Sequence, residues 1–243
     1  MVKRVQRAQV TIFVIIAIVI VGLIGAFFLL RNNFQTSQQL LPADMDYVIN
    51  EVDNCLKLTL MDGTKLLGMQ GGYIIPPQNS LKTNFSYIAW GYFKGENTLN
   101  SESEMEEELA AYIQMTMPIC FNPYSFSKYK IEISAPKATA KIEKDSVSTS
   151  LSFPFTASKD NETYIVNKKY SAQYDVNLGD MRDVAQKIVE REIKNPEIID
   201  FSYLHSFNYS IQILNNPDKT LVYEIADLNP LGSYIFRFAN KLK

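Results

Sequence analysis

The chain has 243 residues, of which 47% are hydrophobic and 21% charged, and its formal net charge is −2. These values exclude a disordered chain, which has fewer apolar residues and a larger net charge. The near-zero charge gives no reason to expect a nucleic acid as a partner. With two cysteines and one histidine, most metal sites and histidine-based active sites cannot be built.

The first feature along the chain is a long apolar segment, residues 10–30. None of its 21 residues is charged, and Thr11, Gly22 and Gly25 are its only residues that are not apolar. A helix of this length is about 31 Å long, which matches a hydrocarbon core of about 30 Å. We therefore predict a single transmembrane helix over residues 10–30, with the lipid bilayer as a partner.

The charges that flank this segment predict its orientation. Lys3, Arg4 and Arg7 precede it, and only Arg31 follows closely. The positive-inside rule then places a basic tip, residues 1–9, in the cytoplasm and the C-terminal domain outside the cell membrane. A cleaved secretory signal is the alternative, but it has a shorter apolar core and a small-residue cleavage site. The acidic residues all follow Arg31, so the exterior part carries about six more acidic than basic side chains.

The N-terminal residues also carry a resemblance to a known class of proteins. Basic residues followed by Ala8 and Gln9 at the edge of an apolar helix resemble the class III signal of archaeal type IV pilin-like proteins. The resemblance implies that a prepilin-type peptidase cuts between Ala8 and Gln9. Pilins usually have a glutamate five residues into the mature helix, and Phe13 stands at that position here, which argues against a filament.

More of the chain resembles a group of uncharacterised single-pass archaeal membrane proteins. The segments that carry this resemblance are residues 71–77, residues 106–112 and residues 236–240, in addition to the apolar segment. The resemblance extends over most of the chain. It implies a membrane-anchored protein and supplies no activity.

The exterior part begins with a predicted stalk, residues 31–42, followed by a domain over residues 43–243. Apolar residues recur at helical spacing from Met45 to Leu60, and Gly68 or Gly71 and Gly72 end this helix. Residues 85–93 favour a strand. A second helix is predicted over residues 102–117, with a capping box formed by Ser101 and Glu104 and with Pro118 at its end.

From residue 128 to residue 176 the hydrophobic period changes to two, with turns at 143–146 and 158–161, which predicts antiparallel strands. Asp180 is predicted to cap a third helix that ends at Asn195 and Pro196. Two strands, residues 208–214 and 220–225, then form a hairpin, and a further strand covers residues 233–239. The fold class is therefore α+β: an N-terminal transmembrane helix and a mixed ectodomain with antiparallel sheet and about three helices. Two subdomains divided near residues 121–128 are the alternative to one unit.

Two kinds of covalent modification are predicted for this domain. Cys55 and Cys120 both lie in the exterior part, where an oxidising environment favours a disulfide over two free thiols. Asn-x-Ser/Thr sequons at Asn84, Asn161 and Asn208 are candidate glycosylation sites, and three is close to the number expected by chance.

No catalytic constellation is evident. His205 lies between aromatic residues, and no serine stands in a nucleophile motif beside it. Five glutamates between Glu102 and Glu108 lack the spacing of an EF-hand and favour a solvated helix start. No glycine-rich nucleotide-binding motif occurs, so we expect no cofactor, no metal and no catalytic residue.

These observations favour a membrane-anchored extracytoplasmic protein with a non-enzymatic binding, surface or assembly role, similar in its processing to a pilin. Its expected partners are a second copy of the chain or other envelope proteins. The alternative is an anchored cell-envelope hydrolase that uses carboxylates. A deep cleft with two acidic residues free of ion-pair partners would favour the hydrolase, and an exposed apolar patch would favour the binding role.

Intact-mass measurement of the mature chain tests the processing that the N-terminal resemblance implies. We expect the protein to begin at Gln9, because Arg7, Ala8 and Gln9 match the cleavage pattern of the class III signal. A chain that begins at Met1 or Val2 contradicts the prediction.

Overall fold

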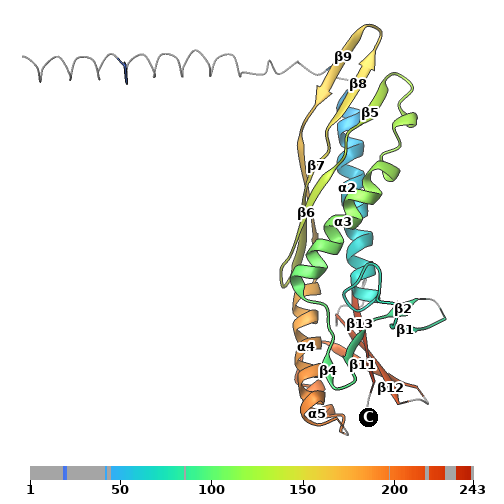
Figure 1. Ribbon diagram of the computed structural model, residues 1–243, viewed down its shortest axis with the longest axis vertical. Coiled ribbons are helices and arrows are strands. Elements are labelled where there is room, and N and C mark those ends of the chain that lie inside the picture. The colour runs from blue at the N-terminus through green and yellow to red at the C-terminus, as the bar shows by residue number, and fades with distance from the viewer. Residues whose placement is uncertain are drawn as a thin grey trace, which may run out of the picture. The chain divides into compact units, whose positions relative to one another are not determined.

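The computed structural model describes residues 19–20, 42, 45–84, 86–196, 198–216, 219–227 and 234–241. The chain divides into two units, Met1–Leu41 and Pro42–Lys243. The second unit is an α+β domain in which two long helices pack against a three-stranded meander and a third long helix packs against a second sheet (Figure 1). No subdivision near residues 121–128 is found within it.

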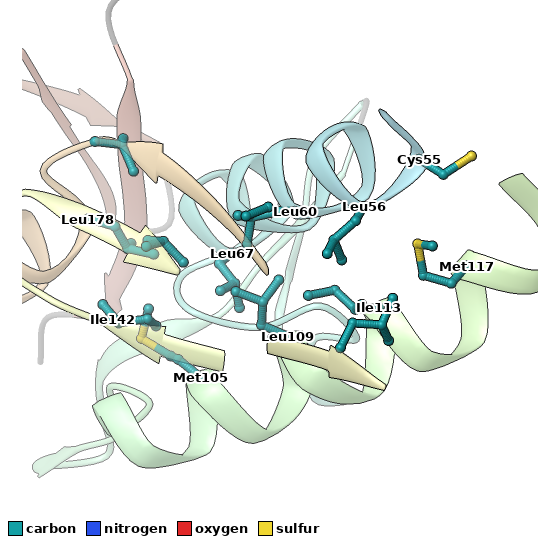
Figure 2. Packing of buried hydrophobic residues seen from close by; sticks show 14 of the residues in the cluster. Cys55, Leu56, Leu60, Leu67, Met105, Leu109, Ile113, Met117, Ile142 and Leu178 are labelled. Atoms are coloured by element: carbon teal, nitrogen blue, oxygen red, sulfur yellow. The ribbon is translucent and has the colours of Figure 1, made fainter. Parts of the chain in front are cut away.

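The helices α2 (Asp46–Met69) and α3 (Glu102–Cys120) form an antiparallel pair at the centre of this domain. Each helix buries one apolar side. Figure 2 shows Leu56, Leu60 and Leu67 of α2 close to the buried side of α3, whose members are Met105, Leu109, Ile113 and Met117. All seven side chains have no exposed surface, so this contact is a dry core that the helical spacing in the sequence predicts.

Local signals explain where these two helices begin and end. Gly71 and Gly72 both adopt a positive φ, which residues with a side chain rarely do, and the chain turns there at the end of α2. Ser101 caps α3 through the predicted capping box with Glu104. Both predictions are confirmed.

The prediction that Pro118 ends the second helix is wrong. The helix α3 continues to Cys120, and the backbone N–H of Phe121 still donates to the carbonyl oxygen of Met117 at 2.9 Å. Pro118 lacks the N–H that would bond to the carbonyl of residue 114, which removes one hydrogen bond, but the N–H of Phe121 still bonds within the helix, so the helix continues past the proline.

The predicted disulfide between Cys55 and Cys120 is present and joins the first half of α2 to the last residue of α3. Cys55 is 2% exposed. The bond closes a chain segment with a sequence separation of 65 residues, and it fixes the helix end that Pro118 weakens.

Beside the two helices runs a three-stranded antiparallel meander with a break in every strand (Figure 1). One half pairs in the order β5-β8-β9 and the other in the order β10-β7-β6. The break is bridged by a hydrogen bond from the N–H of Ser134 to the carbonyl of Pro154 at 2.9 Å. The strands are β5 (Lys130–Ile133), β6 (Lys137–Ile142), β7 (Ser146–Ser152), β8 (Phe155–Lys159), β9 (Glu162–Val166) and β10 (Lys169–Asp175). The predicted change to strand periodicity and both predicted turns are confirmed.

A second sheet has the order β11-β12-β13-β3-β4, and α4 packs against β3, β12 and β13. Its strands are β3 (Trp90–Phe93), β4 (Glu96–Asn97), β11 (Ser210–Asn215), β12 (Thr220–Ala226) and β13 (Ile235–Lys241), and α4 is Leu178–Lys194. Smaller elements are β1 (Leu81–Lys82), β2 (Tyr87–Ile88), the 3-10 helix η2 (Pro123–Ser125) and α5 (Phe201–Leu204). The pairing of β13 with β3 is parallel. It places a strand that begins at Ile235 beside one that begins at Trp90.

The start of β13 packs closely against α2. A side chain on Gly68 would lie 2.4 Å from the carbonyl oxygen of Ile235, so only glycine permits this approach. The hydroxyl of Tyr234 donates to the carbonyl oxygen of Thr64 at 2.6 Å, and Tyr234 is 7% exposed. Gly68 therefore serves the contact between α2 and β13 and does not end the helix.

Two local predictions need correction. The third long helix begins at Leu178, so Asp180 lies in its first turn and does not cap it. The predicted strand over residues 85–93 is divided at Ala89, whose N–H donates to the carbonyl of Gln70 at the end of α2 and whose carbonyl accepts from the N–H of Ala239 in β13. Phe85 lies outside the described residues.

The prediction of a transmembrane helix as part of the fold is also corrected. Among the residues that the structure describes, no helix is long and apolar enough to cross a membrane. The longest of them, α2, exposes Asp46, Lys57, Asp62 and Lys65 on its outer side. Of the segment 10–30, only Val19 and Ile20 are described. The domain is an α+β fold with antiparallel sheets and four α-helices, α2 to α5.

Reduction of the disulfide is expected to lower the free energy of unfolding by about 2–4 kcal/mol, because the bond restricts a long loop in the unfolded chain. Urea unfolding with and without dithiothreitol measures the difference. The double variant C55A/C120A serves as the control and should respond to urea identically in both buffers. Equal midpoints for the oxidised and reduced wild type would contradict the prediction.

Candidate functional site

The described part of the domain has an acidic cleft of about 470 Å³ where the end of β10, the start of α4, the end of β12 and the start of β13 meet. Aspartate, asparagine and tyrosine side chains predominate in its lining. The lining residues are Asp145, Tyr174, Asp175, Val176, Asn177, Asp180, Asn208, Tyr209, Asp227 and Tyr234.

Backbone hydrogen bonds hold one wall of this cleft in place. The N–H of Val176 donates to the carbonyl of Asp145 at 3.0 Å, and the N–H of Asp180 donates to the carbonyl of Lys144 at 3.2 Å. The turn between β6 and β7 is thereby bound to the junction of β10 and α4. The wall depends on main-chain groups, so its position does not depend on which side chains the turn carries.

Asp180 is held by a tyrosine from the opposite wall. The hydroxyl of Tyr209 donates to Oδ2 of Asp180 at 2.6 Å. Burial, together with the bond to Asp180, raises the pKa of Tyr209 above its ordinary value, so this hydroxyl keeps its proton at all physiological pH values. This bond fixes the carboxylate of Asp180 in the first turn of α4.

Asp227 has a neutral donor of its own. The side-chain amide of Asn177 donates to Oδ1 of Asp227 at 2.8 Å. Asp145 and Asp175 are exposed at the rim. Among the described residues, none of these four aspartates takes part in an ion pair, so no described side chain compensates their negative charge.

The chemistry of the lining suits an organic cation better than a metal ion. Within the described ranges, no three acidic, histidine or cysteine residues lie close enough together to hold a metal. Three tyrosines, Tyr174, Tyr209 and Tyr234, stand among the carboxylates. Aromatic faces and carboxylates together bind ammonium and guanidinium groups, and the volume lies within the range of small-ligand sites.

A second, larger hollow has fewer charged and aromatic side chains in its lining. It measures about 550 Å³ and lies over the strands β6, β7 and β10. Serine, threonine and alanine predominate there, and Lys141 is its one charged residue. That lysine already pairs with Glu102 and Glu106 of α3. The hollow therefore has no free charged group and no acid–base pair.

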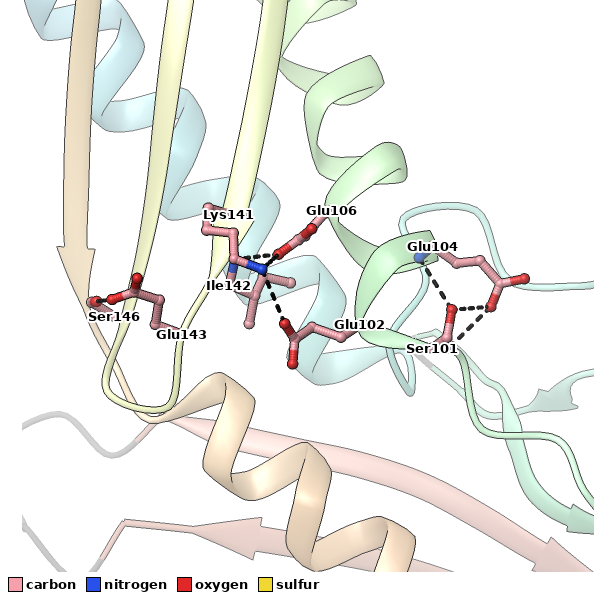
Figure 3. Close-up of polar contacts among 8 residues, drawn as sticks. All are labelled: Ser101, Glu102, Glu104, Glu106, Lys141, Ile142, Glu143 and Ser146. Carbon is pink, nitrogen blue, oxygen red and sulfur yellow. Dashed lines mark hydrogen bonds and ion pairs between the residues drawn. The ribbon is translucent and has the colours of Figure 1, made fainter.

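Four of the five glutamates at the start of α3 support the fold (Figure 3). Glu106 accepts from the backbone N–H of Ile142 and from Lys141, both at 2.9 Å. Glu102 pairs with the same lysine at 3.3 Å, and Glu104 completes the capping box. Glu108 accepts from the N–H of Ile74 at 2.6 Å. Four of the five carboxylates therefore have structural partners.

The other residues that the sequence singles out do not meet at one site. His205 is exposed, and its Nδ1 lies 2.7 Å from the carbonyl of Phe201, within its own helical turn. Asn84, Asn161 and Asn208 are all exposed, and Asn208 lies at the cleft. Lys3, Arg4, Arg7, Ala8 and Gln9 lie outside the described residues, so the predicted orientation and processing stay predictions.

Sequence reasoning missed the cleft because its residues are far apart along the chain. Asp145 and Asp227 are 82 positions apart and share no motif. Each cleft aspartate occurs in a turn, at the end of a strand or at the start of a helix, where aspartate is common for local reasons. Backbone bonds between the β6–β7 turn and the start of α4, and the packing of α4 on β12 and β13, bring these residues together, and no local pattern predicts either contact.

A second notable carboxyl is Glu192 of α4, which is 5% exposed. The hydroxyl of Tyr223 donates to one of its oxygens, and the side-chain amide of Asn240 donates to the other at 2.5 Å. Asn240 also accepts from the N–H of Tyr92 at 2.9 Å. Burial raises the pKa of Glu192, although the two hydrogen bonds oppose the shift. The network connects α4 to three strands beneath it, which makes it structural.

Comparison with known proteins found no match: no family model, curated protein or solved structure is significantly similar to this chain. The resemblance to pilin-like archaeal membrane proteins therefore stays an expectation. The cleft is interpreted from its own residues.

The raised pKa of Glu192 predicts a pH-dependent stability. The folded protein holds the proton more tightly than the unfolded chain, whose glutamates have an ordinary pKa of 4.5. The contribution of Glu192 is complete below that value and is lost as the pH rises through the raised pKa. The variant E192Q cannot ionise, so its free energy of unfolding should improve relative to the wild type between pH 4 and pH 8.

Urea unfolding across that pH range measures the difference. The matched control is E190Q, the same substitution on the exposed side of the same helix. A constant difference for E192Q would show that its carboxyl has no raised pKa.

Proposed function

We propose that this protein is an extracytoplasmic, non-enzymatic binding protein whose acidic cleft binds a cationic group on another envelope component. The observation that carries the proposal is the cluster of aspartates without ion-pair partners among the described residues, placed in a cavity with three tyrosines. Lysine side chains of an envelope protein have the size and charge that fit this cavity.

Two features support a ligand over a solvated surface. Asp180 and Asp227 are half-buried, and each already has one neutral donor that fixes the side chain in place. A carboxylate that is positioned before binding loses less entropy when a ligand arrives. A carboxylate has more acceptor sites than one neutral donor uses, so each can also accept from a charged donor, which forms shorter and stronger bonds than a neutral one.

The disulfide supports the proposed location outside the cytoplasm. Disulfides persist in oxidising compartments and are rare in the cytosol. The bond between Cys55 and Cys120 lies within the core of the domain and joins its two longest helices. Three exposed sequon asparagines are compatible with the same location.

A carboxylate-based hydrolase is the second candidate, because the cleft holds aspartates free of ion pairs. Such an enzyme needs one carboxyl that keeps its proton and acts as the general acid. Asp180 and Asp227 each accept a hydrogen bond from a neutral donor that fixes the carboxylate in place. The three tyrosines that line the same cleft suit a cationic ligand, so binding is the first candidate.

Binding of trilysine tests the proposal. We expect the full-length protein to bind this peptide in isothermal titration calorimetry, and more weakly as salt is added. The variant D180N/D227N should weaken binding roughly tenfold, because two charge contacts of about 0.5–1 kcal/mol each are lost. Asparagine keeps an acceptor for Tyr209 and Asn177, so the fold should persist.

The matched control is D62N/E107Q, which changes the net charge equally at exposed acids on α2 and α3. Its affinity for trilysine should equal that of the wild type at the same salt concentration. Equal losses in both variants would reveal nonspecific attraction to an acidic surface and would reject the cleft as the binding site.

A further inference from the structure

The second sheet ends in an unusual edge strand, β11. Among the described strands, edges longer than two residues are β5, β6, β9, β10 and β11. The first four each contain at least one lysine, aspartate or glutamate, whereas the six residues of β11, Ser-Ile-Gln-Ile-Leu-Asn, contain none. Charged residues on edge strands prevent edge-to-edge pairing, so β11 lacks the protection that the other edges have.

This edge has one hydrogen-bonded neighbour in the described part of the chain, β12. The pairing places Ile211 opposite Ile225 and Ile213 opposite Tyr223, and both partners are fully buried on the side of α4. Ile211 and Ile213 themselves are only half-buried. Their outer sides therefore face a space that a further strand would fill.

A groove of about 490 Å³ lies in that space, beside β11 and next to α5. Its apolar lining is Ile199, Phe201, Leu204, Ile211, Ile213 and Leu221. Phe201 is 59% exposed, and Leu214 at the end of the strand is 50% exposed. Figure 1 shows α5 below α4, at the same end of the domain as β11 and β12. An unpaired edge beside an apolar groove is the arrangement that accepts an added strand.

We propose that two copies of this chain associate through antiparallel pairing of β11 with β11 of the second copy. The sequence of the strand is self-complementary in one register. With Gln212 opposite Gln212 of the second copy, Ile211 lies opposite Ile213 and Ile213 opposite Ile211, all on the groove side. A register centred on Ile213 would instead set Ile211 against Asn215, so the apolar match selects the first.

A second copy is the occupant that this strand fits best. A two-fold axis through Gln212 uses the same patch on both chains and closes the assembly at two copies. It brings the two apolar grooves together on one side of a continuous sheet, where each covers the exposed side of the other. The assembly involves none of the aspartates of the acidic cleft, so it does not rest on the proposed ligand and can fail independently of it.

Cysteine cross-linking of the full-length protein tests the pairing directly. Both native cysteines are in the disulfide, so the variant Q212C carries a single free thiol. Directly opposite residues in an antiparallel pair have Cβ atoms about 4.5–5.5 Å apart, which is close enough for a bond after a small adjustment. We expect Q212C to form a covalent dimer under mild oxidation. The control Q173C, at an exposed glutamine of the edge strand β10, should stay largely monomeric.

A charge swap at the same position gives a second measurement. Sedimentation velocity should show dimers for the wild type and roughly fivefold weaker association for Q212K, because like charges then lie opposite each other. Mixing Q212K with Q212E should restore association. Glu224 lies opposite Gln212 on β12, so the lysine gains an acidic neighbour and the fold should persist.

Three results would overturn the proposal: a wild type that sediments as a monomer, a Q212C that cross-links no better than Q173C, or an association that Q212K leaves unchanged. A fourth result would overturn it as well: in a monomeric sample, slow hydrogen exchange of those β11 amides that point away from β12 would show that another segment of the chain covers the edge.

Discussion

The close contact between α2 and β13 is the constraint on which the rest of the domain depends. Gly68 provides room for the backbone of Ile235, and Tyr234 bonds across the contact to Thr64. From that start β13 runs between β12 and β3, antiparallel to one and parallel to the other. The last strand along the chain thereby pairs with β3, a strand that follows α2 by about twenty residues.

Several other features depend on the position of β13. Asn240 of this strand bonds both to Glu192 of α4 and to the backbone of Tyr92 in β3, so it fixes the third long helix on the sheet. Tyr234 also forms part of the acidic cleft. The same strand order leaves β11 at the far edge, beside its apolar groove. The proposed binding site and the proposed dimer edge are therefore two results of one topology.

Local structure could be predicted from the sequence where local physics decides it. The apolar spacing of α2, the capping box at Ser101 and the alternating residues after Lys128 each express a short-range rule, and the structure agrees with them. The disulfide follows from the count of two cysteines in one domain. The helix boundaries predicted from Pro118 and Asp180 are wrong by a few residues. A helix end tolerates a proline, and aspartate is favourable at several first-turn positions.

Long-range arrangement could not be predicted in this way. The parallel pairing of β13 with β3 joins residues almost 150 positions apart, and the buried network around Glu192 joins four elements. The place of Asp227 in the cleft and the edge position of β11 depend on the strand order of that sheet. Gly68 could have given a signal, since a glycine within a strong helical pattern indicates a close approach, but the sequence does not say what approaches.

Native-state hydrogen exchange measures the central claim most directly, because it reports the free energy at which each segment opens. If the contact between α2 and β13 unites the domain, the buried amides of β12, β13 and β3 will exchange with the same opening free energy as those in the middle of α2. Exchange of the β11-β12-β13 strands at a much lower free energy than α2 would show that the second sheet unfolds by itself, and would contradict the account.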